Sequence, residues 1–139
     1  MINYNFNTDG NYSYCELTYN NLTFTGTAQC HEDDQDMRSE RTGCFIAEMR
    51  AKIQMLQWIR DYEILPLVKS YRHLHDCMSH SKQYNKKSYE ARCLYRQLQN
   101  YEKELITIRE EIKESREYLK NYIAKKDELY QRIRAGKTN

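Results

Sequence analysis

The chain has 139 residues, 40% of them hydrophobic, and a formal net charge of only +2. This length is typical of a single domain. The sequence contains no run of about 18 apolar residues and no basic leader segment, so we expect neither membrane spanning nor export. One proline and four glycines leave few turns, which favours long helices over an all-β fold.

Charge is distributed unevenly along the chain. Residues 1–43 carry seven acidic and two basic side chains, whereas residues 44–139 carry thirteen acidic and twenty basic ones. The basic part favours a small anionic ligand over duplex nucleic acid, because glutamates interrupt its basic side chains. Five cysteines, an odd number at irregular spacing, are typical of reduced thiols in a cytoplasm.

Residues 1–28 predict a small antiparallel β-meander. The predicted strands are residues 2–7, 12–19 and 22–28. Asn20 and Asn21 separate the last two, and since asparagine tolerates a left-handed backbone, they predict a two-residue hairpin turn. A meander of this size cannot bury its own apolar face. We therefore expect the following helices to cover it.

The next segments predict a loop and a first helix. Residues 29–43 are acidic and lack hydrophobic periodicity, so they predict a loop in which Thr42 caps the following helix. Residues 44–78 then carry apolar side chains at helical spacing, among them Ile46, Met49, Ile53, Leu56 and Ile59. Pro66 lacks a backbone donor, so we expect a kinked helix or two helices in line.

Residues 79–87 predict a second loop, and residues 88–136 a long second helix. Its apolar positions alternate steps of three and four, the pattern of a coiled-coil seam. The seam comprises Ala91, Leu94, Leu98, Tyr101, Leu105, Ile108, Ile112, Ser115, Leu119, Tyr122, Lys126, Leu129 and Ile133. At 1.5 Å per residue the helix spans roughly 70 Å, more than the first helix can cover, so part of the stripe should meet another copy.

These elements predict an α+β fold that is mainly α. In it, the small antiparallel β-meander packs on a long antiparallel helical hairpin, which oligomerises through coiled-coil-like packing.

Two clusters are candidate metal ligands. His73, His75, Cys77 and His80 lie close together in the sequence, but a structural zinc needs four tetrahedral ligands and the distant donors fit no zinc spacing. The acidic run 32–36 lacks the glycine and the ligand spacing of a calcium-binding loop. We expect neither a metal nor another cofactor.

Catalytic motifs are not evident. The sequence has no glycine-rich phosphate loop and no G-x-S-x-G turn. Adjacent carboxylates such as Glu110 and Glu111 are typical of a coiled-coil surface rather than of acid–base catalysis. We expect no enzymatic activity.

Basic and aromatic side chains are the candidate ligand-binding residues. Arginine pairs bidentately with phosphate, and an aromatic ring stacks on a base. The candidates are Arg92, Arg109, Lys113 and Arg116 for phosphate, and Tyr84, Asn85 and Tyr89 for the base. The alternative for Arg109 and Arg116 is ordinary coiled-coil pairing with Glu104 and Glu111.

Two stretches resemble a known family. Residues 26–34 (GTAQCHEDD) and 42–51 (TGCFIAEMRA) look like the hairpin-to-helix junction of small phage proteins. Among these is the phage Thoeris anti-defence sponge family of the first described type. The family sequesters glycocyclic ADP-ribose signals without degrading them and assembles through long helices. The resemblance implies a phage protein of the host cytoplasm that forms a dimer or a hexamer; the candidate residues above come from their chemistry and position alone.

Three functional hypotheses follow. The first is a phage anti-defence protein that captures a cyclic nucleotide immune signal, glycocyclic ADP-ribose or a cyclic oligonucleotide, in pockets between protomers without cleaving it. The second is an anti-CRISPR or other protein-binding inhibitor of host defence that uses the acidic run 32–36 as a nucleic-acid mimic. The third is a coiled-coil scaffold or virion component.

Overall fold

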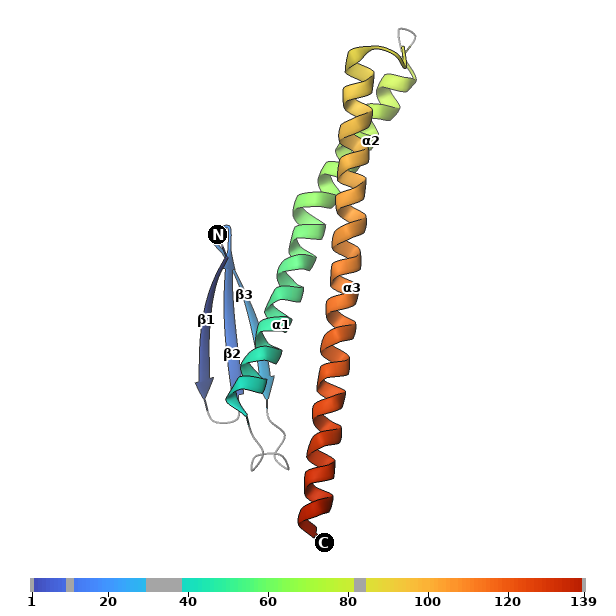
Figure 1. The fold of residues 1–139 in the computed structure, drawn as a ribbon. Coiled ribbons are helices and arrows are strands. Elements are labelled where there is room, and N and C mark those ends of the chain that lie inside the picture. The colour runs from blue at the N-terminus through green and yellow to red at the C-terminus, as the bar shows by residue number, and fades with distance from the viewer. Residues whose placement is uncertain (1, 10–11, 30–38, 82–84, 139) are drawn as a thin grey trace. The chain divides into compact units, whose positions relative to one another are not determined.

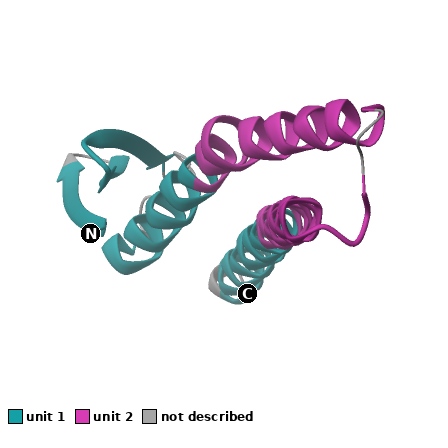
Figure 2. Cartoon of the chain, turned by 90° about the horizontal axis from the view of Figure 1, so that it is seen from above, with its two compact units in different colours: residues 1–55, 113–139 teal, residues 56–112 magenta. Residues whose placement is uncertain are grey.

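The computed structural model describes the chain except for residues 1, 10–11, 30–38, 82–84 and 139. Its elements are β1 (Ile2–Asp9), β2 (Tyr12–Tyr19), β3 (Leu22–Gln29), α1 (Glu40–Trp58), the π-helical turn η2 (Ile59–Ile64), α2 (Leu65–Ser79) and α3 (Tyr89–Thr138) (Figure 1). The predicted α+β class with predominant helix is therefore confirmed. The chain divides into two compact units, residues 1–55 with 113–139 (unit 1) and residues 56–112 (unit 2) (Figure 2).

The strands form one antiparallel sheet in the order β1-β2-β3. Tyr19 of β2 pairs with Leu22 of β3 across the hairpin turn. Asn20 and Asn21 have φ angles of 48° and 65°, the left-handed backbone that this turn requires. The predicted meander and its asparagine turn are confirmed.

Helix α1 packs closely against β3. A Cβ atom on Gly26 of β3 would overlap the carbonyl oxygen of Ala47 and lie 2.7 Å from the backbone nitrogen of Ala51. Only glycine permits this approach of a helix backbone to a strand. Opposite Gly26, Cys15 of β2 is completely buried, as is its neighbour on the same face, Leu17.

The row of β1 that shares this face stays exposed. Ile2, Tyr4 and Phe6 of β1 are each 40–44% exposed, although their register partners on β2 include the buried Leu17 and Cys15. The expectation that helices cover the whole apolar face is therefore wrong for β1. The reason is the close approach of the α1 backbone to β3; from α1, Lys52 reaches β1, with its Nζ 5.6 Å from the centroid of the Tyr4 ring.

Helix α1 starts at Glu40, one turn before the predicted start. The backbone N–H of Thr42 donates to Ser39 Oγ at 3.3 Å, and that of Gly43 donates to the Ser39 carbonyl oxygen at 3.0 Å. Ser39 is thus the N-cap, and the prediction of Thr42 is wrong. The first helical turn is polar, so hydrophobic periodicity does not reveal it.

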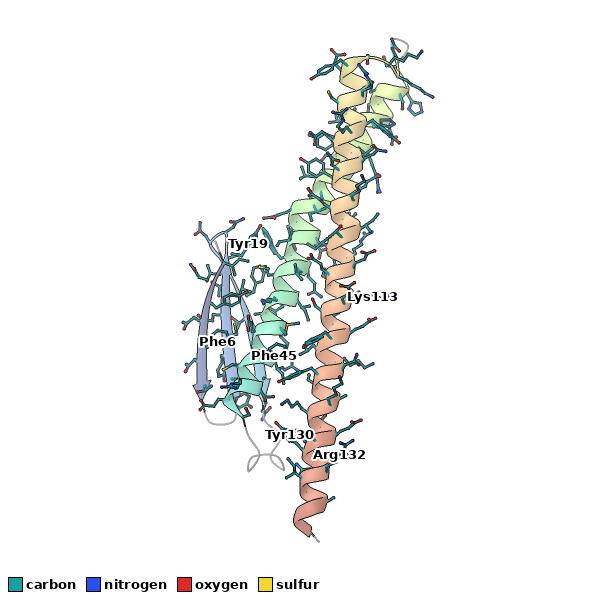
Figure 3. The ribbon with its side chains drawn as sticks, in the orientation of Figure 1. Phe6, Tyr19, Phe45, Lys113, Tyr130 and Arg132 are labelled. Carbon is teal, nitrogen blue, oxygen red and sulfur yellow. The ribbon has the colours of Figure 1, made fainter. Side chains whose placement is uncertain are left out.

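Within unit 1, α1 also contacts the C-terminal part of α3. The Phe45 ring, labelled in Figure 3, lies with its centroid 4.6 Å from that of Tyr122 and 6.3 Å from that of Tyr118. Helix α1 therefore presents Ala47 and Ala51 to the sheet and an aromatic ring to α3. Ala47 was not among the residues predicted for the buried face of this helix.

The helical segment predicted over residues 44–78 is interrupted just before Pro66. The backbone N–H of Leu65 donates to the carbonyl oxygen of Arg60, five residues earlier, which is a π-helical bond. Pro66 stands in the first turn of α2. Proline has no N–H and its ring crowds the preceding turn, so the wider π-turn accommodates it there.

The core of unit 2 lies between α2 and α3. Val68 of α2 is completely buried and packs with Leu105, Ile108 and Ile112 of α3. The partly buried residues around them are Leu56, Ile59, Ile64, Leu65 and Tyr101. The three α3 residues all belong to the predicted seam, so this part of the seam is covered within the chain.

Toward the C-terminus of α3 the seam is less covered. Leu129 is 45% exposed and Ile133 is 38% exposed, although both hold seam positions. Oligomerisation and coiled-coil packing between copies stay predictions, as does the single-domain organisation.

The contact between β3 and α1 predicts a strong effect of Gly26→Ala. The added methyl group must push the α1 backbone away, so we expect the free energy of unfolding to fall by about 1–3 kcal/mol, the usual cost of overpacking. Urea denaturation measures this. The control is Gly136→Ala on α3, where a Cβ meets nothing within 4 Å and alanine favours helix by up to about 1 kcal/mol. Equal effects of the two substitutions would contradict the close approach.

The unit 2 core predicts contrasting effects for two isoleucines of α3. Ile108 is 6% exposed and Ile106 is 56% exposed. We expect Ile108→Ala to destabilise the protein by about 2–5 kcal/mol, and Ile106→Ala by no more than about 0.5 kcal/mol. Thermal and urea unfolding of both variants test this, and a comparable loss at Ile106 would place the seam on another face of α3.

Candidate ligand-binding site

The start of α3 is held by hydrogen bonds of Asn85 and Ser88. Asn85 Oδ1 accepts from the backbone N–H of Lys87 at 3.0 Å, and the Asn85 carbonyl oxygen accepts from that of Ser88 at 3.0 Å. Ser88 Oγ then accepts from the backbone N–H of Ala91 at 3.2 Å, the geometry of an N-cap. The side-chain oxygen of Asn85 is thus engaged in the turn, and its predicted contact with a base stays a prediction.

A groove lies between α2 and α3 near this turn. Its lining residues are Tyr71, Leu74 and Met78 of α2 and Glu90, Cys93, Leu94 and Gln97 of α3, and its volume is about 390 Å³. We call it the tip groove. Pockets for small molecules typically measure about 300–1,000 Å³ and combine apolar walls with a few polar groups. The tip groove has a volume in this range and combines the polar Glu90 and Gln97 with apolar side chains, but it is an open groove rather than an enclosed pocket.

Tyr89 and Arg92 stand next to the tip groove in the sequence of α3. Tyr89 is 72% exposed, and a hydrogen bond with Cys93, a groove residue, raises the pKa of the Tyr89 hydroxyl. Arg92 is exposed one residue before Cys93. Tyr84, the third residue predicted to contact a base, lies outside the described residues.

Contacts between α2 and α3 hold the walls of the tip groove. Tyr71, which lines it, packs against Tyr101 with ring centroids 5.2 Å apart. The next residue, Arg72, forms an ion pair with Glu102 at 3.0 Å. Tyr71 lies within the helical segment predicted over residues 44–78, but the sequence did not predict a groove, because no local pattern reveals where two helices separate.

The other predicted cations are remote from the tip groove. Arg109, Lys113 and Arg116 follow one another along α3 at helical steps of four and three, and all are exposed; Lys113 is labelled in Figure 3. Arg92 precedes Arg109 by 17 residues on the same helix, which corresponds to about 25 Å. A single chain therefore does not bring all the predicted residues into one small-molecule site.

Arg109 lies close to an ion pair of the π-turn. Arg60 Nε donates to Asp61 Oδ1 at 2.8 Å, and this hydrogen bond lowers the pKa of the Asp61 carboxyl, with a smaller contribution from the positive charge of Arg109. The two arginines and the aspartate together carry a net positive charge at this point of unit 2.

The predicted pairing of Arg109 and Arg116 with Glu104 and Glu111 does not occur within the described chain. Glu104 and Glu111 instead line a second groove of about 380 Å³ beside the π-turn, together with apolar residues such as Ile59. In a heptad pattern the e and g positions flank opposite sides of the seam, so such pairs form only between helices.

The histidine and cysteine cluster forms local contacts. Cys77 Sγ lies 3.6 Å from His73 Nε2, and His80 Nδ1 lies 2.6 Å from the Asp76 carbonyl oxygen. Among the described residues, no group of three or more histidine, cysteine, aspartate or glutamate side chains is placed to hold a metal ion. The acidic run 32–36 lies outside the described residues.

No helix in the described part of the chain has both the length and the apolar character needed to cross a membrane. Comparisons of the chain with protein-family models, with curated proteins and with solved structures find no match.

Two adjacent α2 residues test what holds the tip groove. We expect Tyr71→Ala to lower the free energy of unfolding by about 1–3 kcal/mol, since it removes a packed ring. Arg72→Ala should lower it by no more than about 1 kcal/mol, because its ion pair with Glu102 is exposed. Urea denaturation of both variants measures the difference. A larger loss at Arg72 would mean that charge pairing, not ring packing, joins the two helices.

Proposed function

We propose that this protein is a phage anti-defence sponge, which binds a cyclic nucleotide immune signal and keeps it from its receptor without cleaving it. The signal is glycocyclic ADP-ribose or a cyclic oligonucleotide. The observation that carries the proposal is the tip groove, an open groove of about 390 Å³ with apolar walls and a few polar groups, together with the exposed ring of Tyr89, whose hydroxyl hydrogen-bonds with the groove residue Cys93. The family resemblance at the hairpin-to-helix junction motivates the choice of ligand.

In this proposal the base of the signal occupies the tip groove. Leu74, Met78 and Leu94 offer apolar surface to the faces of the base, while Glu90 accepts a hydrogen bond from an exocyclic amine and Gln97 offers both a donor and an acceptor. The exposed ring of Tyr89 closes over the base by stacking.

The phosphates of the signal are bound by arginines. Arg92 and Arg96 are exposed and lie one turn apart on α3, so a phosphate between them receives two guanidinium groups. A nucleotide held there does not reach the row formed by Arg109, Lys113 and Arg116, about 25 Å away along the helix. That row contributes only if a second copy brings it to a tip groove, as in the predicted pockets between protomers.

A capture-and-release experiment tests the proposal. Purified protein is mixed with glycocyclic ADP-ribose or with a cyclic dinucleotide, freed of unbound nucleotide by filtration, and then heated. We expect the filtrate after heating to contain the intact nucleotide, identified by mass spectrometry. A converted product, or no uptake of either nucleotide, would contradict a sponge.

Variants at the tip groove locate the site. We expect Tyr89→Ala and Arg92→Ala each to weaken nucleotide binding at least about tenfold in calorimetric titrations. Stacking of the base on Tyr89 contributes about 1–3 kcal/mol, a charged hydrogen bond from Arg92 to a phosphate about 1.5–3 kcal/mol, and a factor of ten corresponds to about 1.4 kcal/mol. The control is Arg132→Ala, an exposed arginine near the other end of α3, labelled in Figure 3. Circular dichroism verifies that each variant is folded.

The outcome of the same titrations distinguishes the other hypotheses. A protein that binds neither nucleotide but retains a host defence protein in a pull-down is the protein-binding inhibitor. A protein that binds none of these and only self-associates is a scaffold or virion component. If Arg132→Ala lost as much nucleotide binding as Arg92→Ala, the result would contradict the location of the binding site at the tip groove.

A further inference from the structure

The two edges of the sheet differ in what covers them. The order β1-β2-β3 leaves β1 and β3 at the edges. On β3, the carbonyl oxygen of Thr25 accepts a hydrogen bond from Gln54 Nε2 at 3.0 Å, and that of Thr27 accepts one from Arg50 Nη1 at 2.7 Å. Both donors come from α1, so side chains of this helix occupy the β3 edge.

The register shows which backbone groups of β1 point outward. In antiparallel sheets, hydrogen-bonded pairs alternate with non-hydrogen-bonded pairs. The outward carbonyl groups of Thr25 and Thr27 identify the non-hydrogen-bonded positions of β3, and Thr25 pairs with Glu16 of β2. Glu16 therefore directs its backbone toward β1, where it pairs with Asn5. The backbone N–H and C=O groups of Asn5 therefore point toward β2. Because the direction alternates along a strand, those of the residues on either side of the asparagines point away from the sheet; these residues are Ile2, Tyr4, Phe6 and Thr8.

Strand β1 has few of the features that usually protect an edge strand. Edge strands are commonly guarded by charged side chains, proline or a β-bulge. Its charged residue, Asp9, stands at the C-terminal end of the strand, and residues 2–8 (INYNFNT) contain neither charge nor proline. The pairing of β1 with β2 runs without a bulge from Ile2 to Asp9. From α1, Lys52 Nζ lies 5.6 Å from the centroid of the Tyr4 ring, over the apolar face and not along the open backbone edge. No strand lies beyond β1 in the described part of the chain. This edge is thus a template for another strand.

We infer that β1 pairs antiparallel with β1 of a second copy of this chain, so that two three-stranded sheets become one of six strands. A second copy fits this edge because the strand is self-complementary. With the two-fold axis at Asn5, Ile2 lies opposite Thr8 and Tyr4 lies opposite Phe6 of the other copy. The outward backbone groups then form about eight hydrogen bonds, no like charges meet, and both copies' half-exposed apolar rows join on one face.

The opposite face of the joined strands is equally self-complementary. Asn5 meets Asn5 of the other copy, and Asn3 meets Asn7. Side-chain amides carry both donors and acceptors, so these pairs satisfy one another. The contact involves one edge strand from each copy, so we expect its area to fall below the roughly 1,200–2,000 Å² of stable interfaces. We therefore expect a reversible dimer that dissociates on dilution into the low micromolar range. This dimer does not require a ligand in the tip groove.

Disulfide trapping tests the register. Asn5 forms a non-hydrogen-bonded pair with its own counterpart, with Cα atoms about 4.5 Å apart, within the range of about 4.4–6.8 Å that disulfides span. We expect Asn5→Cys to give a cross-linked dimer under mild oxidation, in which mass spectrometry identifies a disulfide-linked peptide that joins position 5 of the two copies. Asn3→Cys alone should not cross-link through position 3, because its counterpart lies about 13 Å away, but Asn3→Cys combined with Asn7→Cys should.

Proline variants test the edge itself. Phe6→Pro removes an outward N–H and leaves the bonds between β1 and β2 intact. The matched control is Thr25→Pro, which removes an outward N–H at the covered β3 edge. In sedimentation velocity across a concentration series, we expect Phe6→Pro to raise the dimer dissociation constant at least about tenfold and Thr25→Pro to leave it unchanged. Phe6→Lys, which introduces a charge at the edge, should act like Phe6→Pro.

Several results would overturn the inference. A wild-type protein that is monomeric well above the protein concentration of the trapping experiment, together with an Asn5→Cys variant that does not cross-link, excludes the pairing. A dimer that persists in folded Phe6→Pro and Phe6→Lys assembles through another surface. Loss of the dimer in Thr25→Pro as well as in Phe6→Pro, with circular dichroism unchanged, would assign it to the whole sheet rather than to the β1 edge.

Discussion

Unit 1 depends on the ability of α1 to pack with two faces at once. Toward the sheet it presents Ala47 and Ala51, whose small side chains let its backbone approach Gly26. Toward α3 it presents Phe45, which contacts Tyr118 and Tyr122. Small residues on one side and a ring on the other are needed because a three-stranded sheet and an amphipathic helix each have an apolar face that neither buries alone.

The same constraint explains why the sheet is unevenly protected. A helix that lies against β3 has its polar side chains within reach of the β3 edge, where Arg50 and Gln54 bind backbone carbonyl groups. It leaves β1 with exposed apolar side chains and an open hydrogen-bonding edge. The inferred strand pairing and the predicted seam contacts use different surfaces of the chain. Both contacts can therefore form at the same time in an assembly larger than a dimer.

Unit 2 contains a proline, Pro66, within a long helical segment. The π-turn before Pro66 accommodates the missing donor, and Val68 two residues later packs into the seam of α3. Farther along α2 the two helices leave the tip groove between them. The candidate residues are consequently divided: Tyr89 and Arg92 stand in the first turn of α3, whereas Arg109, Lys113 and Arg116 occupy a distant stretch of the same helix.

The sequence by itself determined the α+β class, the asparagine hairpin and the seam of α3, because each depends on local backbone preference or on a periodicity of two or three and a half residues. Tertiary structure alone decided that α1 meets β3 through Gly26, that β1 stays exposed, and that Tyr71 and Cys93 line one groove. These features depend on which faces meet and how closely. No local pattern encodes that, because a small residue or a polar cap has the same sequence signature whether or not another element lies against it.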